Sequence, residues 1–328
     1  MQKLPRIPLH GWLAIDKPVG MTSADVVNKV KWLTRVQKLG HAGTLDPLAS
    51  GVLPIAFGEA TKTIAYCMDS TKTYVFTVSF GAATATDDRE GKIIATSDVL
   101  PTCEEIEAAL PAFTGKILQT PPVYSAIKVG GERAYKLARE GEKVELKARE
   151  VEVFSLSRVR ERVGVRALAS DSVAALTLPS PARGRGLAEA TFEMTCGKGT
   201  YVRALARDLA LKLGTFGHIT ALRRTRVGHF TEKNTILLEN LEKIVHSAPP
   251  SESVPEVLLP VEAVLDDIPV LHLDDNSARL LAYGQTVKFA GASLHQGIVC
   301  AFAQGRLLAL AQAADGAIKP VRIFNLSS

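Results

Sequence analysis

The stretch His41-Ala-Gly-Thr-Leu-Asp46-Pro-Leu-Ala-Ser-Gly-Val-Leu-Pro54 carries a single acidic residue within a segment that is dense in Gly and Pro. Pro47 steers Asp46 away from helical φ/ψ and towards an extended conformation. Leu45 and Leu48 flank the carboxylate and can anchor the loop in a core. We expect a shaped loop that holds one carboxylate in place, either as a catalytic group or as a loop-capping aspartate.

The segments around this loop predict strands and helices in an order that contains no regular βαβ repeat. Residues 11–16 predict a short buried strand, and Ser23 is placed to cap the helix that follows. Residues 73–80 alternate apolar and polar side chains, which is typical of a strand with one buried face. Thr102 and Glu105 have the spacing of a helix capping box. This mixture favours an α+β fold with a mostly antiparallel mixed sheet.

Composition changes along the chain predict two domains, at about residues 1–250 and 258–328. Residues 248–255 combine Pro, Ser and Glu and resemble a linker. The apolar runs beyond it are short and separated by Gly and Asp, which predicts a small β domain. Residues 168–188 are rich in small residues and predict a flexible surface loop, either a passive insertion or an RNA contact through its arginines.

The charge of the chain favours an acidic partner for its larger part. The 328 residues carry a net charge of +5, and residues 255–328 hold five Lys or Arg against seven Asp or Glu. Residues 1–254 therefore carry +7, which suggests contact with a polyanion, although a solvated basic surface would give the same balance. The four cysteines are scattered, which argues against disulfides and structural zinc. The sequence predicts a cytoplasmic protein without a membrane segment or a bound metal.

Several further motifs give the chain a family resemblance, because they occur in the same order and at similar spacing over residues 11–230. Together with the Asp46 segment they resemble the motifs of the TruB family, the tRNA pseudouridine-55 synthases. The matching segments are Gly11-Trp-Leu-Ala-Ile-Asp-Lys-Pro-Val-Gly-Met-Thr-Ser23, Lys72-Thr-Tyr74, Pro121-Pro-Val-Tyr-Ser-Ala-Ile-Lys128, Cys196-Gly-Lys-Gly-Thr-Tyr-Val-Arg203 and Leu222-Arg-Arg224.

The resemblance implies a pseudouridine-synthase fold followed by a small C-terminal PUA-like β domain that binds RNA. It implies an enzyme that isomerises uridine 55 in the T-loop of tRNA to pseudouridine. The reaction breaks the N1–C1′ bond, turns the uracil and joins C5 to C1′, and it requires neither redox cofactor nor metal. The target base must be flipped out of the folded loop. The expected partner is the T-arm of tRNA, and the expected state is a monomer.

The resemblance also assigns roles to individual residues. Asp46 is the essential carboxylate, Arg203 the cation that pairs with it, and Tyr74 the ring that stacks on the flipped uracil. Without the family match, Tyr74 would be read as core, and Arg203 as a surface arginine paired with Asp208 or Asp46 for structure only. The remaining expected substrate contacts are His41, Tyr201, Leu222, Lys17, Lys128 and Lys198.

Residues 120–150 resemble the insertion with which the family grips RNA. Between Lys128 and Arg149 there are seven Lys or Arg and four Glu. These cations would contact phosphates and position the substrate without reading its sequence. A salt-bridged surface helix with pairs such as Glu132–Lys136 is the alternative for part of the segment.

Two rival functions share the same scaffold. One is a non-catalytic protein that binds or folds tRNA, and the other is a dyskerin-type subunit of guide-RNA particles. The presence of Asp46, Tyr74 and Arg203 argues against the first, because binding alone does not require the carboxylate. The second would need a longer N-terminal extension than the ten residues before the first motif.

Overall fold

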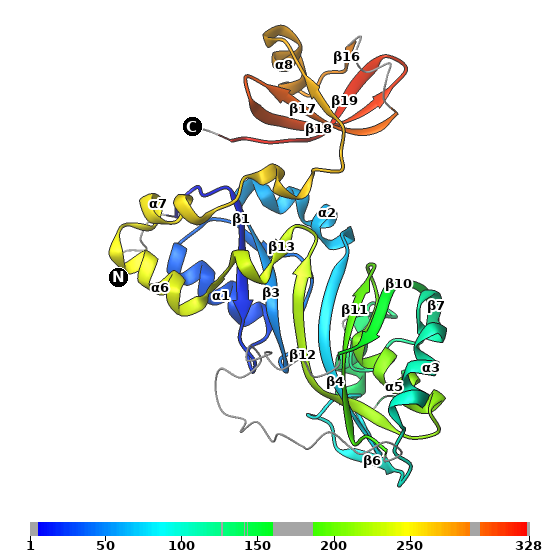
Figure 1. Ribbon diagram of the computed structural model, residues 1–328. Helices are drawn as coiled ribbons and strands as arrows, with labels where there is room; N and C mark the ends of the chain where they lie inside the picture. The colour runs from blue at the N-terminus through cyan, green and yellow to red at the C-terminus, as the bar shows by residue number, and fades with distance from the viewer. Residues whose placement is uncertain are drawn as a thin grey trace. The chain divides into compact units, whose positions relative to one another are not determined.

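The computed structural model describes residues 6–125, 127–140, 142, 144–159, 186–288 and 296–326, without the side chains of Lys128, Arg133 and Arg139. The chain forms two compact units. Unit one comprises Met1–Pro47, Gly51–Ser70 and Val227–Ser328, and unit two comprises Leu48–Ser50 and Thr71–Arg226. The coloured ribbon of Figure 1 traces both along the chain.

Strand β1 (Gly11–Lys17) is the central strand of the N-terminal sheet in unit one. It pairs antiparallel with β3 (Ala49–Phe57) and parallel with β14 (Thr235–Leu237), and β2 (Leu39–His41) pairs with β3. Almost every side chain of β1 is buried, as expected for a strand covered on both faces. The other elements of this part are α1 (Ser23–Thr34), η1 (Gly58–Thr63), α2 (Ile64–Asp69), β13 (Phe230–Thr231), η3 (Glu232–Asn234) and α6 (Leu238–Ser247).

Helix α1 begins one residue earlier than the sequence predicted. The cap is Thr22, whose hydroxyl accepts a hydrogen bond from the Asp25 backbone N–H, while the Asp25 carboxylate accepts from the Thr22 N–H. Ser23 therefore lies in the first turn, and its hydroxyl is bonded to Leu45 instead. The prediction that Ser23 caps the helix was wrong, because the neighbouring threonine has a capping-box partner three residues later.

The C-terminal part of unit one is a five-stranded sheet with strand order β15-β17-β18-β19-β16, drawn in orange and red in Figure 1. All pairings are antiparallel except that of β15 with β17. This sheet has the short strands that the sequence predicted. Its elements are β15 (Val270–His272), α8 (Asp275–Ala282), β16 (Val287–Lys288), β17 (Gly297–Ala303), β18 (Arg306–Ala314) and β19 (Ala317–Ile323).

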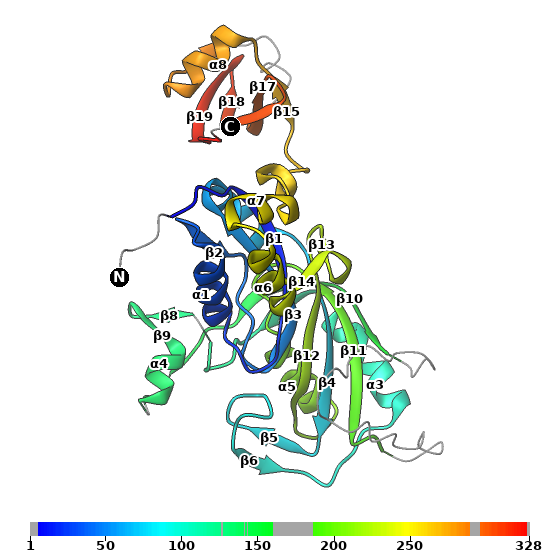
Figure 2. The ribbon, with the colours of Figure 1, turned by 90° about the vertical axis from the view of Figure 1, so that its left-hand side faces the viewer.

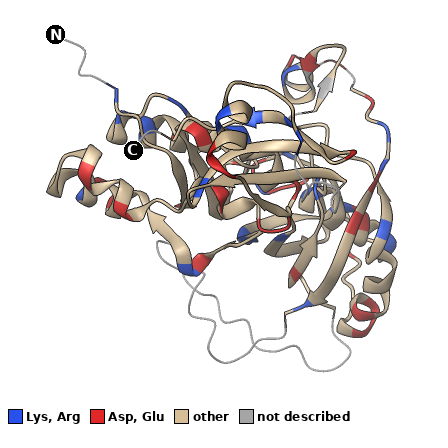
Figure 3. Ribbon diagram, turned by 90° about the horizontal axis from the view of Figure 1, so that it is seen from above, with Lys and Arg blue, Asp and Glu red and all other residues tan. Residues whose placement is uncertain are grey.

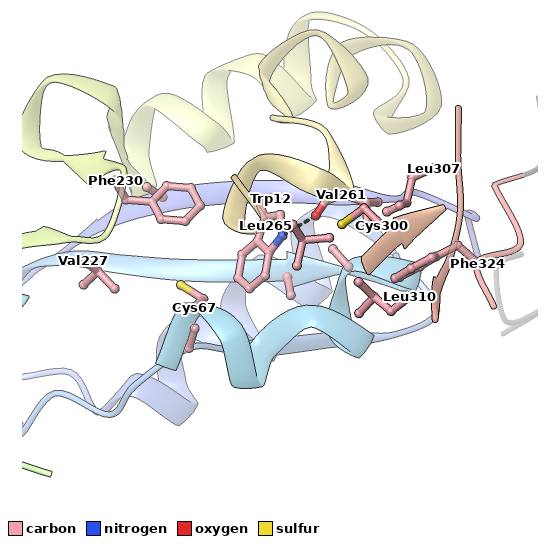
Figure 4. Packing of buried hydrophobic residues seen from close by; sticks show 14 of the residues in the cluster. Trp12, Cys67, Val227, Phe230, Val261, Leu265, Cys300, Leu307, Leu310 and Phe324 are labelled. Atoms are coloured by element: carbon pink, nitrogen blue, oxygen red, sulfur yellow. Dashed lines mark hydrogen bonds between the residues drawn. The ribbon is translucent and has the colours of Figure 1, made fainter. Parts of the chain in front are cut away.

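Trp12 lies at the centre of a buried cluster that joins N-terminal and C-terminal segments of unit one (Figure 4). Its side chain is 0% exposed, and its indole N–H donates to the Val261 carbonyl at 3.2 Å. Val261 is the first residue of η5 (Val261–Val264), and Leu265 directly follows this helix. The expected linker at 248–255 is not an extended tether, because it contains α7 (Pro250–Ser253) and the start of η4 (Pro255–Val257).

Unit two is built on strands in the order β12-β4-β11-β10-β7. The pairings of β4 with β11, β11 with β10 and β10 with β7 are antiparallel. The bounds are β4 (Lys72–Phe80), β7 (Gly115–Gln119), β10 (Arg149–Arg158), β11 (Glu189–Cys196) and β12 (Gly217–Val227). The helices are α3 (Cys103–Ala109), η2 (Leu110–Phe113) and α5 (Val202–Lys212).

Two small hairpins extend unit two. One is formed by β5 (Ala82–Thr84) and β6 (Ile93–Thr96), and the other by β8 (Lys128–Val129) and β9 (Glu132–Arg133). Helix α4 (Ala134–Arg139) follows β9 directly, and Figure 2 shows β8, β9 and α4 together as one element.

The architecture confirms an α+β fold with a mostly antiparallel mixed sheet and a C-terminal β domain. Most of the predicted loop at 168–188 lies outside the described residues. The predicted division at about residue 250 stays a prediction. No helix in the described part of the chain is both long and apolar enough to cross a membrane.

Candidate active site

Asp46 lies in unit one, on the connection between β2 and β3. Ser23, in the first turn of α1, fixes the residue before it, because the Ser23 hydroxyl accepts from the Leu45 N–H at 2.8 Å and donates to the Leu45 carbonyl at 3.1 Å. Ser23 and Leu45 are both buried, whereas Asp46 itself is half-buried. The carboxylate thus stands on a backbone that is anchored in the core, as predicted from its flanking leucines.

Lys17 fixes the residue that follows Asp46. Its ammonium donates to the carbonyls of Pro18 at 2.9 Å, Met21 at 2.5 Å and Pro47 at 3.4 Å. The Pro47 carbonyl also accepts from the Gly20 N–H at 2.7 Å. Lys17 is 0% exposed, so the structure gives it a role in holding the turn and the loop together. The predicted contact between Lys17 and substrate stays a prediction.

His41 is the last residue of β2, where it pairs with Ile55 of β3. It is half-buried and stands five residues before Asp46. Gly43, between them, has φ of +95°, a conformation that a residue with a side chain rarely adopts. The turn at Gly43 brings the chain from β2 into the loop that carries Asp46.

Arg203, in unit two, is a buried arginine in the first turn of α5. It is 5% exposed and donates to the carbonyls of Thr86 at 2.8 Å and Tyr124 at 2.9 Å. Its guanidinium also lies 3.7 Å from the Asp88 carboxylate. Burial contradicts the alternative of a surface arginine. The predicted pairing with Asp46 stays a prediction.

Asp87 and Asp88 are the residues that the sequence analysis missed. They occupy a turn after β5, where Asp87 has φ of +59° and forms an ion pair of 3.1 Å with Arg207. Burial raises the pKa of the Asp87 carboxyl, and the guanidinium groups of Arg207 and Arg203 oppose that shift. The Asp88 carboxylate accepts from the Glu90 N–H at 3.0 Å. Two adjacent aspartates a few residues before a glycine were the available signal.

The alternative role of Arg203 paired it with Asp208, but Asp208 pairs with Arg207 instead. The Asp208 carboxylate accepts from the Arg207 Nε at 2.9 Å. Arg207 thus joins Asp87 and Asp208, and it also donates to the Thr120 carbonyl at 2.8 Å. Two successive arginines of α5 therefore hold the Asp87–Asp88 turn and the start of the segment at 120–125.

Tyr74 and Leu222 lie on neighbouring strands of unit two, β4 and β12. Tyr74 is half-buried opposite Met194 of β11, whereas Leu222 is buried. Phe76 is fully packed, with its ring stacked 5.5 Å from that of Phe192. Phe76 belongs to the buried face predicted for this strand, and Tyr74 is more accessible than Phe76 and Phe80.

Tyr201 and Lys198 belong to the segment between β11 and α5. Lys198 is exposed in the turn, and Tyr201 is half-buried at the N-cap position of the helix. The guanidinium of Arg149 lies 5.2 Å from the centre of the Tyr201 ring, a distance at which cation–π attraction operates. Cys196 starts the segment, and burial raises the pKa of its thiol to about 11.

The insertion at 120–150 contains the surface ion pairs that the sequence offered as an alternative to RNA contacts. Lys136 in α4 lies 3.0 Å from the Glu132 carboxylate and 3.8 Å from that of Glu140. All three side chains are half exposed, so the pairs add little stability. The side chain of Lys128 lies outside the described residues. The described residues contain no group of three or more His, Cys, Asp or Glu that could hold a metal ion.

Comparisons with known proteins give the chain a family. Residues 31–202 match the N-terminal domain model of the TruB family pseudouridylate synthases, and residues 203–266 match the C-terminal domain model of tRNA pseudouridylate synthase B. A Rhodospirillum rubrum protein named tRNA pseudouridine synthase B is 48% identical over 326 residues, which cover 97% of each chain. A Bradyrhizobium diazoefficiens protein of the same name is 50% identical over 98% of this chain and 88% of its own.

A chain from a solved Cbf5-Nop10-Gar1 complex has a TM-score of 0.69 to this structure at 24% identity. The match covers 96% of this chain and 85% of that one, and at this identity it concerns the fold alone. The family models and the relatives confirm the predicted family. The chain therefore belongs to the TruB family of pseudouridylate synthases.

Proposed function

We propose that this protein converts uridine 55 in the T-loop of tRNA to pseudouridine, with Asp46 as the essential carboxylate and without a cofactor. Family membership and the names of relatives that align over nearly the whole chain support the reaction and its tRNA substrate. The observation that carries the role of Asp46 is its anchoring. The residues on both sides of it are tied to buried side chains, Ser23 and Lys17.

A fixed carboxylate suits this reaction because uridine isomerisation needs one group held close to the ribose and the base for several bond changes. The N1–C1′ bond breaks, the uracil turns, and a C5–C1′ bond replaces it while the C5 proton leaves and N1 takes up a proton. Asp46 acts on the sugar or on the base during these bond changes. In the proposal, Arg203 supplies the positive charge that the family motifs pair with this carboxylate.

Base flipping is the second part of the proposal. The uracil leaves the T-loop at a cost of a few kcal/mol, and stacking on the Tyr74 ring offsets part of that cost. Leu222 and Tyr201 line the same pocket, and His41 helps to fill the space that the flipped nucleotide leaves. Tyr74 is suited to this role because it is the half-buried aromatic residue on a strand whose Phe76, Val78 and Phe80 are buried.

RNA binding is spread over many residues in the proposal. Figure 3 shows Lys and Arg in blue on many segments of the ribbon, interspersed with Asp and Glu in red. Lys198 is exposed and Lys128 is a further contact implied by the motifs, whereas the buried Lys17 holds the turn and the Asp46 loop. We propose residues 1–250 as the catalytic domain and 258–328 as a PUA-like RNA-binding domain of a cytoplasmic monomer. Phosphate contacts would position the T-arm without reading its sequence.

The two rival functions receive less support. The likeness to a chain of the Cbf5-Nop10-Gar1 complex concerns the fold, whereas the relatives that are 48% and 50% identical carry the name tRNA pseudouridine synthase B. A tRNA-binding protein without catalysis would have no need for a carboxylate held from both sides.

The proposal is tested with purified protein and an unmodified tRNA transcript labelled with tritium at uracil C5, after dialysis against a chelator. We expect stoichiometric tritium release at one uridine per tRNA, and also from an isolated T-arm stem-loop. The matched control is a transcript with cytidine in place of uridine 55, which should release none. Release that depends on an added cofactor, or that persists with the control transcript, would contradict the proposal.

A further inference from the structure

The side-chain amide of Gln119 holds the backbone of Tyr201 at two points. The Tyr201 N–H donates to Gln119 Oε1 at 2.8 Å, and Gln119 Nε2 donates to the Tyr201 carbonyl at 3.1 Å. Gln119 is the last residue of β7 and is 1% exposed. The two residues are 82 positions apart in the sequence, so this contact is a tertiary one.

Tyr201 occupies the N-cap position of α5, and its side chain makes no cap hydrogen bond. The backbone N–H groups at the start of a helix have no carbonyl partner within the helix, and buried backbone polar groups require a partner. The Tyr201 carbonyl accepts from the Leu205 N–H at 3.1 Å. Gln119 supplies the acceptor for the Tyr201 N–H and a second donor to the Tyr201 carbonyl.

A second side chain lies over the Tyr201 ring, and it belongs to the residue that pairs with Gln119 in the sheet. Gln119 and Arg149 are register partners on β7 and β10, and the Arg149 guanidinium lies 5.2 Å from the centre of the Tyr201 ring. The backbone of Tyr201 is thus held by one member of the pair and its ring by the other. With both ends held, the ring has little freedom to turn.

We propose that Gln119 is a positioning residue for uridine isomerisation, which acts by fixing Tyr201 in the uracil pocket. The inference rests on the function proposed above and adds a residue to it. Gln119 is 1% exposed and its amide is bonded to the Tyr201 backbone, so it acts through Tyr201. Its loss should therefore slow the chemical step and leave tRNA binding, which is spread over many phosphate contacts, nearly unchanged.

The test compares Gln119→Leu with the wild type in single-turnover pseudouridine formation, with enzyme in excess over tRNA, and in tRNA binding. We expect the rate to fall by at least about tenfold and the tRNA Kd to change by less than about threefold, the pattern of an interaction made after binding. The control is Gln37→Leu at an exposed glutamine, which should match the wild type in both measurements.

The deciding readout is a double-mutant cycle with Tyr201→Ala. Once the ring is absent, Gln119→Leu should slow the reaction by less than about twofold further, because coupled residues do not act additively. A full additional loss would show that Gln119 acts elsewhere and would overturn the inference. An unchanged rate for Gln119→Leu, or a loss confined to the tRNA Kd, would overturn it too.

If Gln119→Leu does not fold, Gln119→Glu takes its place, because it keeps the side-chain length and the acceptor for the Tyr201 N–H. An ionised carboxylate has no proton for the Tyr201 carbonyl, so we expect a rate below that of the wild type and an unaltered tRNA Kd. A wild-type rate for this variant would contradict the need for both hydrogen bonds. A wild-type protein that makes no pseudouridine would refute the proposed function itself, which is a different result.

Discussion

At the scale of single residues, Lys17 shows how a charged side chain can serve a catalytic loop without lying on the surface. Its ammonium is enclosed, and three backbone carbonyls accept its hydrogen bonds, including that of Pro47 next to Asp46. Burying a charge is costly unless its hydrogen bonds are satisfied. The three carbonyls are stabilised as well, because the ammonium donates a hydrogen bond to each of them.

Replacing Lys17 with Met should lower both stability and activity. Met fills a similar volume but leaves the three carbonyls without this donor, at a cost of about 1–3 kcal/mol in the free energy of unfolding for a buried group left unsatisfied. The loop at Asp46 should loosen, so kcat should fall more than tRNA affinity.

The control is Lys29→Met, which removes a partly exposed ion pair with Glu242 and should cost at most about 1 kcal/mol. Urea unfolding and steady-state kinetics measure both quantities. Equal effects of the two variants would contradict the role assigned to Lys17.

Arg203→Lys should be impaired although the charge is kept. The guanidinium reaches the Thr86 carbonyl, the Tyr124 carbonyl and the Asp88 carboxylate from one position, and an ammonium lacks that planar fork. We expect kcat to fall at least about tenfold and the unfolding free energy to fall by about 2 kcal/mol, since charged hydrogen bonds are lost. A variant with wild-type kcat and stability would contradict this account of Arg203.

At the scale of elements, local signals decide where the helices begin. Helix α1 starts at a reciprocal pair of Thr22 and Asp25, and α3 starts at the equivalent pair of Thr102 and Glu105. Each pair satisfies backbone N–H groups at the helix start for which the helix offers no backbone carbonyl. The start of α1 also sets Ser23 against Leu45, so the cap is linked to the loop that carries Asp46.

Thr22→Ala should destabilise the protein by about 1 kcal/mol, the usual effect of losing an N-cap side chain. Thr22→Ser is the matched control, because it keeps the hydroxyl and should stay within a few tenths of a kcal/mol of the wild type. Thermal unfolding of both variants provides the comparison. An alanine variant as stable as the serine variant would show that the capping box adds nothing here.

Most elements could be predicted because their signals are local. The alternation at 73–80 predicted the strand found at Lys72–Phe80, and the box at Thr102 predicted α3. The reading of 40–54 as a loop was wrong in part, because β3 extends over Ala49–Phe57. Gly and Pro weaken the strand signal in the sequence. Pro54 has no N–H to donate, but its carbonyl still accepts a hydrogen bond from the Ala42 N–H.

Only those site residues that belong to a recognisable sequence motif could be predicted. Asp46, Tyr74 and Arg203 came from motifs, and the structure adds what surrounds them. Asp88 is 115 residues from Arg203 in the sequence, and nothing local in either segment indicates that they meet. Gln119 was missed for the same reason, since its partner is the backbone of Tyr201, which leaves no trace in residue type.

At the scale of the whole molecule, the C-terminal segment completes the core of unit one. Trp12 from β1 packs with Val261, Leu265, Leu310 and Phe324 in one buried cluster. Lys62 of η1 donates to the Ile323 carbonyl at 2.7 Å, and Glu59 accepts from the Asn325 N–H at 2.7 Å. These contacts make residues 258–328 part of the packing of the N-terminal strands as well as a sheet of their own.

Truncation should therefore destabilise the remaining chain in steps. A protein that ends at residue 268 keeps η5 over Trp12, whereas one that ends at residue 250 loses that cover and the hydrogen bond to Val261. We expect the unfolding free energy to decrease from the full chain to 1–268 and further to 1–250, by an amount on the order of the 3–5 kcal/mol that loss of buried Trp packing costs.

Fluorescence can follow this effect, because the chain has two tryptophans and Trp32 is 74% exposed. In a Trp32→Phe background, emission reports Trp12 alone. The emission should shift to longer wavelength in 1–250 and much less in 1–268. Identical spectra and identical melting temperatures for the two truncations would contradict the packing role of 261–265.

The most direct measurement is position-resolved mapping of pseudouridine in a tRNA transcript after incubation with the wild-type protein and with Asp46→Asn. Asparagine keeps the shape of the side chain but removes its charge, while tRNA affinity rests on many phosphate contacts. We predict modification at uridine 55 by the wild type, none by Asp46→Asn under single-turnover conditions, and similar tRNA affinity for both. Turnover by Asp46→Asn, with deamidation to Asp excluded by mass spectrometry, or modification at another position by the wild type would contradict the account.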